Sequence, residues 1–553
     1  MKTFRERAIS RLRSARHFPS LGKFLALLAV LMLLGLAGGA INREAIRASL
    51  GLVTGEDDAE KQVRAFPEWL SGIVRQPPDT ADYVPIAYNG VNPFGVNTFL
   101  NQEVEDKKRA LQLDMIRAAG FHWIRQEFPW EDIEIHAKGD FMDRRNAKPV
   151  SAWDKYDSIV RMANEHGIQV IVRLSTPPRW SRKDAAAIAT TPPDKLSDFG
   201  DFVDAVVKHY KGQVSYYQIW NEPNVYPEWG DQEVSPEGYV ELLKTGYTRA
   251  KAVDPDVVIL SAPLAPTIEL GPRDMNDFVF LQRMYDAGAR NFFDILSIND
   301  YGLWSGPSDQ RMRPRVLNFS RPLYVRDIMV HNGDEHKAIW ASEMGWNAIP
   351  LDHPAVPAFG RASDAQLARY IPAAYERAQQ EWPWMGVMAY WFFKRATDAE
   401  QGQAFYFFRM LNPDFKALPV YDAFKQYANQ PAAIYPGYFQ EDHWAMQYTG
   451  QWPIVTEPKA VLGKYRSSTR VSDALEFSFY GTGLDVVFVR GLAGGTVRVS
   501  IDDRPPQTLS LETPQETFGV RSRIASGLTR SRHRARIEVV TPVIGVDGVV
   551  VYP

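Results

Sequence analysis

The chain has 553 residues, which is too long for one hydrophobic core, so we expect two or more domains. Its 63 Lys and Arg residues nearly balance its 66 Asp and Glu residues, and a formal net charge of −3 gives no reason to expect a nucleic acid partner. The absence of cysteine excludes disulfide bonds, zinc–thiolate sites and a cysteine nucleophile.

The N-terminus combines a basic leader with a long apolar run. Residues 1–23 carry seven Lys and Arg residues against one acid, and residues 24–41 contain no charge. As a helix, the apolar run would span about 27 Å, close to the hydrocarbon thickness of a bilayer. We therefore expect a cytoplasmic leader over 1–23, a transmembrane anchor over 24–41, and a single-pass protein of the inner membrane with its bulk on the periplasmic side. The alternative is a cleaved signal peptide, because residues 38–40 are small enough for a cleavage site.

Residues 42–85 are expected to form a stalk or linker, since they contain an acidic stretch over 56–60 and the stiff pair Pro77-Pro78. From residue 86 to residue 430, predicted strands and helices alternate regularly. The predicted strands cover 93–99, 121–128, 168–174, 214–222, 257–261, 292–298, 337–343 and 387–393. Eight strand–helix units predict an α/β fold, a closed (β/α)₈ TIM barrel. An open doubly wound sheet is the alternative, and the lack of a glycine-rich nucleotide turn after the first strand counts against it.

After residue 430 the pattern changes to short strands separated by glycine, proline and aspartate turns. The predicted strands cover 475–479, 484–489, 496–501, 507–511 and 536–540. Residues 431–553 are therefore expected to form a C-terminal β-sandwich, an accessory domain that binds carbohydrate or braces the barrel. The arginines at 530, 532, 534 and 536 alternate along one strand, which is typical of a solvent-exposed strand face; contact with an acidic glycan is the alternative.

Two predicted strands each end in a glutamate among aromatic residues. The strand over 214–222 ends in Trp220-Asn221-Glu222 followed by Pro223, and the strand from 337 reaches Glu343. In the count of eight strands these glutamates end strands four and seven, which face each other across a barrel mouth. Such a pair is what a two-carboxylate glycosidase requires. The alternative is that each carboxylate is held in a structural ion pair.

These motifs resemble the retaining glycoside hydrolases of clan A. The segments 94–97 and 124–130, together with the added sandwich, are most similar to glycoside hydrolase family 39. That family includes β-xylosidases, α-L-iduronidases and membrane-anchored hydrolases encoded with bacterial exopolysaccharide synthesis. The resemblance is strong over about residues 90–430 and looser for the sandwich and the anchor.

The resemblance implies a role for several residues. Glu222 would be the general acid/base and Glu343 the nucleophile, while Asn221 would bind the sugar 2-hydroxyl. Arg125 would keep Glu343 ionised, and Tyr301 would donate a hydrogen bond to it. The chain departs from the clan pattern at Asn299-Asp300-Tyr301, where a His-x-Tyr is often found, so no histidine role is expected there. Trp391 would be the platform under the sugar at the cleavage site, with core packing as the alternative.

Other aromatic residues fall on predicted strand-end loops, and together they favour an oligosaccharide groove. For any one of them, packing within its loop is an equally good interpretation. Those that we place in the groove are Trp130, Trp180 and Trp346, with Tyr226, Trp229 and Trp304 as further members. No histidine spacing predicts a metal site, and double displacement needs no cofactor.

The sequence thus predicts a membrane-anchored retaining glycoside hydrolase that cleaves a polysaccharide or oligosaccharide, a bacterial exopolysaccharide by resemblance. Its expected partners are the polysaccharide, the inner membrane through residues 24–41, and the machinery of exopolysaccharide synthesis and secretion. Two alternatives stay open: an inactive glycan-binding scaffold of a secretion system, and a transglycosylase that uses the same residues.

Overall fold

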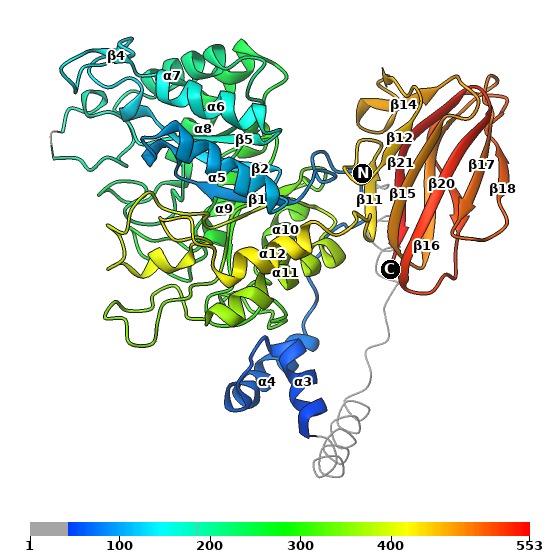
Figure 1. Cartoon of the computed structure of the whole chain (residues 1–553), viewed down its shortest axis with the longest axis horizontal. Helices are drawn as coiled ribbons and strands as arrows, with labels where there is room; N and C mark the ends of the chain where they lie inside the picture. The colour runs from blue at the N-terminus through cyan, green and yellow to red at the C-terminus, as the bar shows by residue number, and fades with distance from the viewer. Residues whose placement is uncertain (1–42, 185) are drawn as a thin grey trace, which may run out of the picture.

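The computed structural model describes residues 43–184 and 186–553, and it contains two main bodies (Figure 1). The first is a barrel of parallel strands surrounded by helices. The second, drawn in orange and red, consists of antiparallel sheets near the C-terminus. The predicted leader over 1–23 and the predicted anchor over 24–41 lie outside the described residues.

Eight parallel strands form the barrel in the order β7-β6-β5-β2-β1-β10-β9-β8. Parallel bridges Leu260–Ile295 and Leu264–Ile298 join the two ends of this order, so the sheet closes on itself. The predicted (β/α)₈ barrel is therefore confirmed, and the open sheet is excluded. The strands are β1 (Phe94–Thr98), β2 (Trp123–Pro129), β5 (Gln169–Ser175), β6 (Tyr216–Ile219), β7 (Val258–Leu260), β8 (Leu296–Tyr301), β9 (Ile339–Gly345) and β10 (Met385–Tyr390).

Helices follow the barrel strands and cover the outside of the sheet. They are α5 (Asp106–Ala118), α6 (Asp154–Glu165), α7 (Leu196–His209), α8 (Pro236–Val253), α9 (Asp277–Asp286), α10 (Pro322–His331), α11 (Asp364–Glu381) and α12 (Pro419–Ala428). Local sequence signals fix where they begin. Ser363 and Gln366 form a capping box at the start of α11, and Ser235 caps α8 ahead of Pro236.

The strands β9 and β10 are buried over their whole length. This is expected of parallel strands that have helices on one side and the barrel interior on the other. Polar side chains on such strands, including Ser342 and Glu343, must find hydrogen-bond partners inside the barrel. The barrel interior is therefore where a polar site can be built.

The C-terminal part is a β-sandwich, as predicted. One sheet has the order β13-β14-β21-β16-β19, with β11 added against β21, and the other has the order β12-β15-β20-β17-β18. Along β20 (Ser531–Thr541), His533, Ala535, Ile537 and Val539 point into the core. The remaining strands are β11 (Gly437–Gln440), β12 (Gln447–Thr449), β13 (Ile454–Thr456), β14 (Lys464–Ser468), β15 (Ala474–Gly481), β16 (Gly483–Arg490), β17 (Thr496–Ile501), β18 (Gln507–Ser510), β19 (Thr517–Ala525) and β21 (Ile544–Tyr552).

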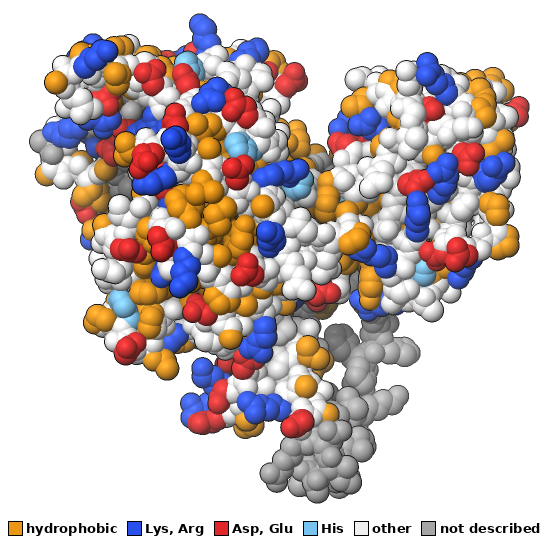
Figure 2. Space-filling model, viewed as in Figure 1, with side chains coloured by type: hydrophobic (Ala, Val, Ile, Leu, Met, Phe, Trp, Pro, Cys, Tyr) orange, Lys and Arg blue, Asp and Glu red, His pale blue; other side chains and the backbone are white. Residues whose placement is uncertain are grey.

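The arginines of β20 lie on the outer face of the sandwich. Arg534 and Arg536 both pair with Glu476 on the neighbouring strand β15. This arrangement agrees with an exposed strand face, the default interpretation of their spacing. Basic and acidic side chains are likewise interspersed over the face shown in Figure 2, as the nearly balanced composition implies.

The sandwich is attached to the barrel at the N-terminal ends of the strands. Asn89, just before β1, donates hydrogen bonds to the carbonyl oxygens of Pro383, just before β10, and of Tyr438 in the sandwich. The backbone N–H of Trp444 donates to the carbonyl of Gly90. The sandwich therefore lies at the end of the barrel opposite to the carboxyl ends of the strands, where barrel enzymes carry their chemistry.

The segment that the sequence assigns to a stalk contains two helices, α3 (Arg43–Thr54) and α4 (Ala59–Ile73). They form a hairpin, drawn in blue at the bottom of Figure 1. The turn at Gly55 has φ +66°, and a Cβ there would lie 2.7 Å from the carbonyl oxygen of Gly306. The backbone N–H of Gly306 donates to the carbonyl of Gly55 at 2.6 Å. The hairpin is thus docked on the loop that follows β8, at the carboxyl end of the barrel.

Residues 43–184 and 186–553 include no helix that is long and apolar enough to cross a membrane. The first helix, α3, has 12 residues and a length of about 18 Å, short of the roughly 30 Å of a bilayer core. On this finding we correct the predicted localisation: a single-pass inner-membrane protein with its catalytic domain on the periplasmic side is contradicted by the described structure.

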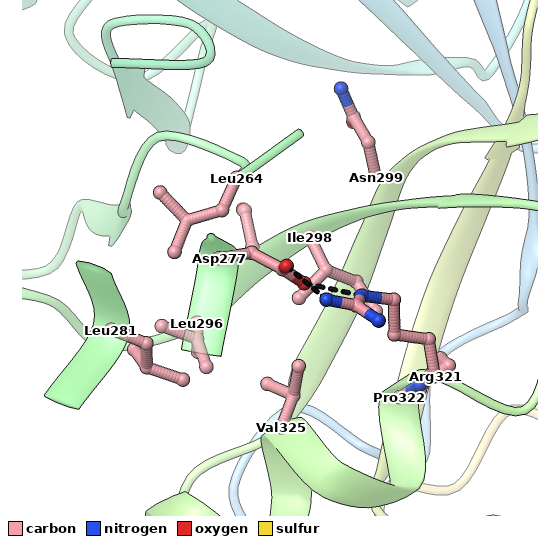
Figure 3. Close-up of a pocket in the computed structure, with 10 residues that line it drawn as sticks. Leu264, Asp277, Leu281, Leu296, Ile298, Asn299, Arg321, Pro322 and Val325 are labelled. Atoms are coloured by element: carbon pink, nitrogen blue, oxygen red, sulfur yellow. Dashed lines mark hydrogen bonds and ion pairs between the residues drawn. The ribbon is translucent and has the colours of Figure 1, made fainter. Parts of the chain in front are cut away.

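A buried ion pair between Asp277 and Arg321 lies on the outer side of the barrel, next to β8 (Figure 3). The Arg321 Nε donates to Asp277 Oδ2 at 2.7 Å, and the two side chains are 4% and 6% exposed. The cavity beside them holds only about 10 Å³ and is lined by apolar residues such as Leu281 and Val325, so it has room for about one water molecule. Asn299 borders this cavity, but in Figure 3 its amide points away from the ion pair.

We predict that Asp277→Ala lowers the free energy of unfolding by about 3–5 kcal/mol, because it leaves the buried Arg321 charge without its partner. Urea unfolding followed by circular dichroism measures the change. Asp231→Ala is the matched control: it removes a partner of Arg273 from a pair that is 46% and 57% exposed, and it should cost less than about 1 kcal/mol. Equal costs for the two variants would contradict this account.

Candidate active site

The two predicted glutamates lie at the carboxyl ends of β6 and β9, the fourth and seventh strands of the barrel in chain order. Glu343 is on β9 itself, and Glu222 follows β6 after Trp220 and Asn221. The backbone φ angles of Trp220 and Glu222 are +78° and +34°, in a region that side chains other than glycine rarely adopt. The chain therefore turns sharply out of β6, and Glu222 sits in a strained conformation of a kind that clusters at functional sites.

Both carboxylate oxygens of Glu343 are fixed by hydrogen bonds. The Arg125 Nη1 donates to Oε1 at 2.8 Å, and the Tyr301 hydroxyl donates to Oε2 at 2.6 Å. The Arg125 and Glu343 side chains are only 2% and 7% exposed. Burial, together with the charge of Glu343, raises the pKa of Tyr301 well above its ordinary value, so the phenol stays protonated and can donate. The structure thus brings these three predicted residues together.

Arg125 connects four barrel strands through its guanidinium group. Besides Glu343, its Nε donates to Gln218 Oε1 at 2.6 Å, its Nη1 to Asn97 Oδ1 at 3.0 Å and its Nη2 to Asn221 Oδ1 at 2.8 Å. The arginine is 3% exposed. A planar guanidinium with five donors can serve several acceptors at once, which a lysine cannot do. Arg125 therefore fixes the positions of groups that come from β1, β6 and β9.

Glu222 has a different environment from Glu343. One of its oxygens accepts a hydrogen bond from Asn299 Nδ2 at 2.6 Å. Burial, then the negative charge of Glu343 and that of Glu228, raises the pKa of Glu222 to about 8. Glu222 is therefore protonated at neutral pH. Two carboxyl groups whose surroundings separate their protonation states are the usual arrangement of an acid and a nucleophile in one site.

Asn221 directly precedes Glu222 in the chain and is only 6% exposed. Its side-chain oxygen accepts a hydrogen bond from Arg125 Nη2 at 2.8 Å. Burial raises the pKa of Glu228. The predicted contact of Asn221 with a sugar hydroxyl stays a prediction, but the residue is held firmly where that contact would be made.

The predicted aromatic residues fall into two groups. Trp391 follows β10, is half-buried and packs edge-on against Phe99 at 5.6 Å, so it stands at the barrel mouth. Trp180 is also half-buried, and its Nε1 donates to the carbonyl of Glu134 at 2.8 Å. These two residues keep part of their surface available to a ligand.

Trp130 and Trp346 are buried, which favours the alternative that they pack within their loops. Trp130 is fully buried, stacks on Phe202 at 5.3 Å and donates its Nε1 to a carboxylate oxygen of Glu134. Trp346 is 1% exposed and donates its Nε1 to the carbonyl of Ser305 at 2.6 Å. Each indole N–H is satisfied inside the protein, so the rings serve packing of their loops.

Sequence reasoning missed several residues of the site. Asn299 could have been found, because it belongs to a polar trio at the end of the sixth barrel strand. Asn97 and Gln218 gave no such signal, since single polar residues on buried strands are common. Glu127 of β2 pairs with Arg173 of the neighbouring strand β5 at 2.6 Å and accepts from the hydroxyls of Ser175 and Thr176. Within residues 43–184 and 186–553 no cluster of three or more His, Asp or Glu side chains could hold a metal ion.

Comparison with known proteins places this site in a recognised context. The family model described as cellulase (glycosyl hydrolase family 5) matches residues 84–261, which include Arg125, Asn221 and Glu222. This match confirms the prediction of an O-glycosyl hydrolase with a barrel of the clan A type. No curated protein matches the chain.

Solved structures with a similar fold include three enzymes of glycoside hydrolase family 39. A family 39 glycoside hydrolase from Bacteroides cellulosilyticus WH2 is 18% identical, with 83% of each chain covered and a TM-score of 0.47. The GH39 enzyme from Xanthomonas axonopodis pv. citri is 13% identical, with 85% of this chain and 99% of that chain covered and a TM-score of 0.45. A GH39 β-xylosidase from Caulobacter crescentus is 15% identical, covering 84% and 99%, with a TM-score of 0.44. At these scores the likeness says nothing about substrate or mechanism.

We predict that two substitutions move the pKa of Glu222 in opposite directions. Glu343→Gln removes a negative charge that disfavours ionisation, so the pKa should fall from about 8. Asn299→Ala removes a hydrogen bond to the carboxylate, so the pKa should rise. Carboxyl titration by ¹³C NMR measures both, with Glu476 on the sandwich as an internal reference. Shifts in the same direction would show that another group sets this pKa.

Proposed function

We propose that this glycoside hydrolase acts by double displacement with retention of anomeric configuration, with Glu343 as nucleophile and Glu222 as general acid/base. The observation that supports this assignment most is the contrast between the two carboxyl groups. The carboxylate of Glu343 accepts hydrogen bonds from the Arg125 guanidinium and the Tyr301 hydroxyl. The carboxyl group of Glu222 is hydrogen-bonded to the Asn299 amide and is protonated at neutral pH.

In the first step Glu343 attacks the anomeric carbon and the glycosidic C–O bond breaks. Glu222 donates its proton to the departing oxygen, which leaves as an alcohol, and a covalent glycosyl ester forms on Glu343. In the second step Glu222, now a carboxylate, takes a proton from water. The resulting hydroxide equivalent attacks the anomeric carbon, and Glu343 leaves as a carboxylate. The acid is regenerated, so protons and bonds balance over the cycle.

The surrounding residues have distinct tasks in this cycle. Arg125 and Tyr301 hold the two oxygens of Glu343, so attack and departure occur with little reorganisation. As Glu343 forms the ester its negative charge is lost, which favours ionisation of Glu222 at the moment when a base is needed. Asn299 supports that change, because its N–H stabilises the carboxylate form of Glu222.

The substrate that we propose is a polysaccharide or oligosaccharide. A bacterial exopolysaccharide is the candidate that the sequence resemblance suggests, and its synthesis and secretion machinery is the matching partner. The half-buried rings of Trp391 and Trp180 at the barrel mouth support a carbohydrate, because aromatic faces pack well on the C–H surfaces of sugar rings.

A panel of aryl β-glycosides and β-linked oligosaccharides tests the reaction. Glu343→Gln should lower kcat by roughly four orders of magnitude or more, because the nucleophilic charge is lost. Glu222→Ala should cost about 10²–10⁴-fold on natural leaving groups and much less on activated aryl glycosides in the first step. Azide should restore turnover of Glu222→Ala and give a glycosyl azide of retained configuration. If azide gave a glycosyl azide of retained configuration with Glu343→Gln instead, the roles of the two glutamates would be exchanged. An inverted first product, detected by proton NMR, would rule out double displacement.

The pH dependence gives an independent prediction. Because the first step needs protonated Glu222, kcat/KM should decline as pH rises through about 8 and stay high below it on this limb. The decline should move to higher pH in Asn299→Ala, whereas Asp231→Ala, a surface substitution, should leave it in place. A basic limb that does not move in Asn299→Ala would mean that another group supplies the proton.

A further inference from the structure

A pocket near the carboxyl end of the barrel is lined by residues from the loops that follow Tyr301 and Glu343, and neither Glu222 nor Glu343 lines it. It holds about 620 Å³ and is bounded by three segments: the α3–α4 turn, the loop after β8 and the loop from β9 to α11. Leu303 and Trp304 belong to the second segment, and Trp346 and Arg361 to the third. The two loops begin at the carboxyl ends of β8 and β9, the strands that carry Tyr301 and Glu343.

The pocket is close to that centre along the chain. Trp304 is three residues after Tyr301, which contacts Glu343, and Trp346 is three residues after Glu343 itself. Three residues span at most about 10 Å. A ligand that extends from the cleavage site along these loops would therefore reach the pocket within a few sugar units.

The pocket has fixed walls. A Cβ at Gly302 would lie 2.1 Å from the Trp346 ring, and a Cβ at Gly360 would lie 2.1 Å from the carbonyl oxygen of Leu303. These close approaches join the two loops to each other. On the third side, Asp57 of the hairpin accepts hydrogen bonds from Gln366 and Arg369 of α11 at 2.9 and 2.8 Å. The hairpin is therefore a structural wall of the pocket.

Three side chains of the pocket are available to a ligand. Trp304 is 55% exposed, an unusual state for an indole ring. Arg361 lines the pocket with a half-buried side chain, and among the described residues this side chain has no hydrogen bond or ion pair. Asp364 carries an exposed carboxylate. An apolar ring face, a free donor and a free acceptor in one pocket match the C–H face and hydroxyl groups of a sugar.

We propose that this pocket is a remote subsite that binds neutral sugar units of the substrate away from the cleaved bond, with Trp304 as the stacking platform and Arg361 as a hydroxyl-binding donor. Four carboxylates line the pocket, those of Glu56, Asp57, Asp58 and Asp364, against two cations, Lys61 and Arg361. Uronic acid units would meet this net negative charge, so neutral units are preferred. The proposal rests on the proposed glycoside hydrolase activity. It gives the N-terminal hairpin a function, the completion of the substrate groove.

Trp304→Ala tests the subsite by a comparison of chain lengths. On the sugar of the panel that the enzyme hydrolyses, kcat/KM for the hexasaccharide should fall about tenfold while kcat/KM for the matching aryl glycoside stays unchanged. Trp304→Phe should restore most of the loss, since it keeps an aromatic face. Val471→Ala, which shortens a 61% exposed side chain on the sandwich, is the control and should change neither value.

Binding without turnover provides the second measurement. In the Glu343→Gln background, calorimetric titration with the hexasaccharide should show weaker binding after Trp304→Ala or Arg361→Gln, and the disaccharide should not distinguish the variants. Equal losses on short and long substrates, or no loss on either, would overturn the subsite and leave the hydrolase intact. Failure to hydrolyse any member of the panel would instead overturn the proposed function and the subsite with it.

Discussion

The site depends on one buried cation. Arg125 is 3% exposed and donates four hydrogen bonds. The acceptors are Asn97 of β1, Gln218 of β6, Asn221 after β6 and Glu343 of β9. A buried charge of this kind is costly unless its donors are all used, so the surrounding strands must keep their register. The guanidinium therefore links the stability of the barrel interior to the positions of the reacting groups.

The same cation separates the two carboxyl groups. It contacts Glu343 directly, whereas Glu222 accepts a hydrogen bond from the Asn299 amide, and its pKa is raised first by burial and then by the charges of Glu343 and Glu228. Glu343 thus has both carboxylate oxygens bound by Arg125 and Tyr301, and Glu222 is an acid at neutral pH. The chemical difference arises from the surroundings of each strand end, not from the glutamates themselves.

The barrel also divides its two ends between two tasks. The sandwich is fixed at the N-terminal ends of the strands through Asn89 and Trp444, away from Glu222 and Glu343. The α3–α4 hairpin is fixed at the carboxyl end, where Gly55 holds it against the loop after β8 and Asp57 holds it against α11. The segment that the sequence suggested as a spacer therefore lies closer to the chemistry than the domain suggested to bind glycan.

The sequence by itself determined the strand–helix alternation, the sandwich and the two strand-end glutamates, because hydrophobic periodicity and strand-end motifs are local signals. Arg125 and Tyr301 were implied by the resemblance to known glycoside hydrolases. Only the tertiary structure decided that Asn299 serves Glu222, that Asn97 and Gln218 serve Arg125, and that Trp130 and Trp346 are core residues. These outcomes depend on which side chains meet across the closed barrel. Asn299 and Glu222 are 77 positions apart in the sequence, and Arg125 and Gln218 are 93 positions apart. No local pattern encodes such long-range proximity, since barrel closure alone brings those residues together.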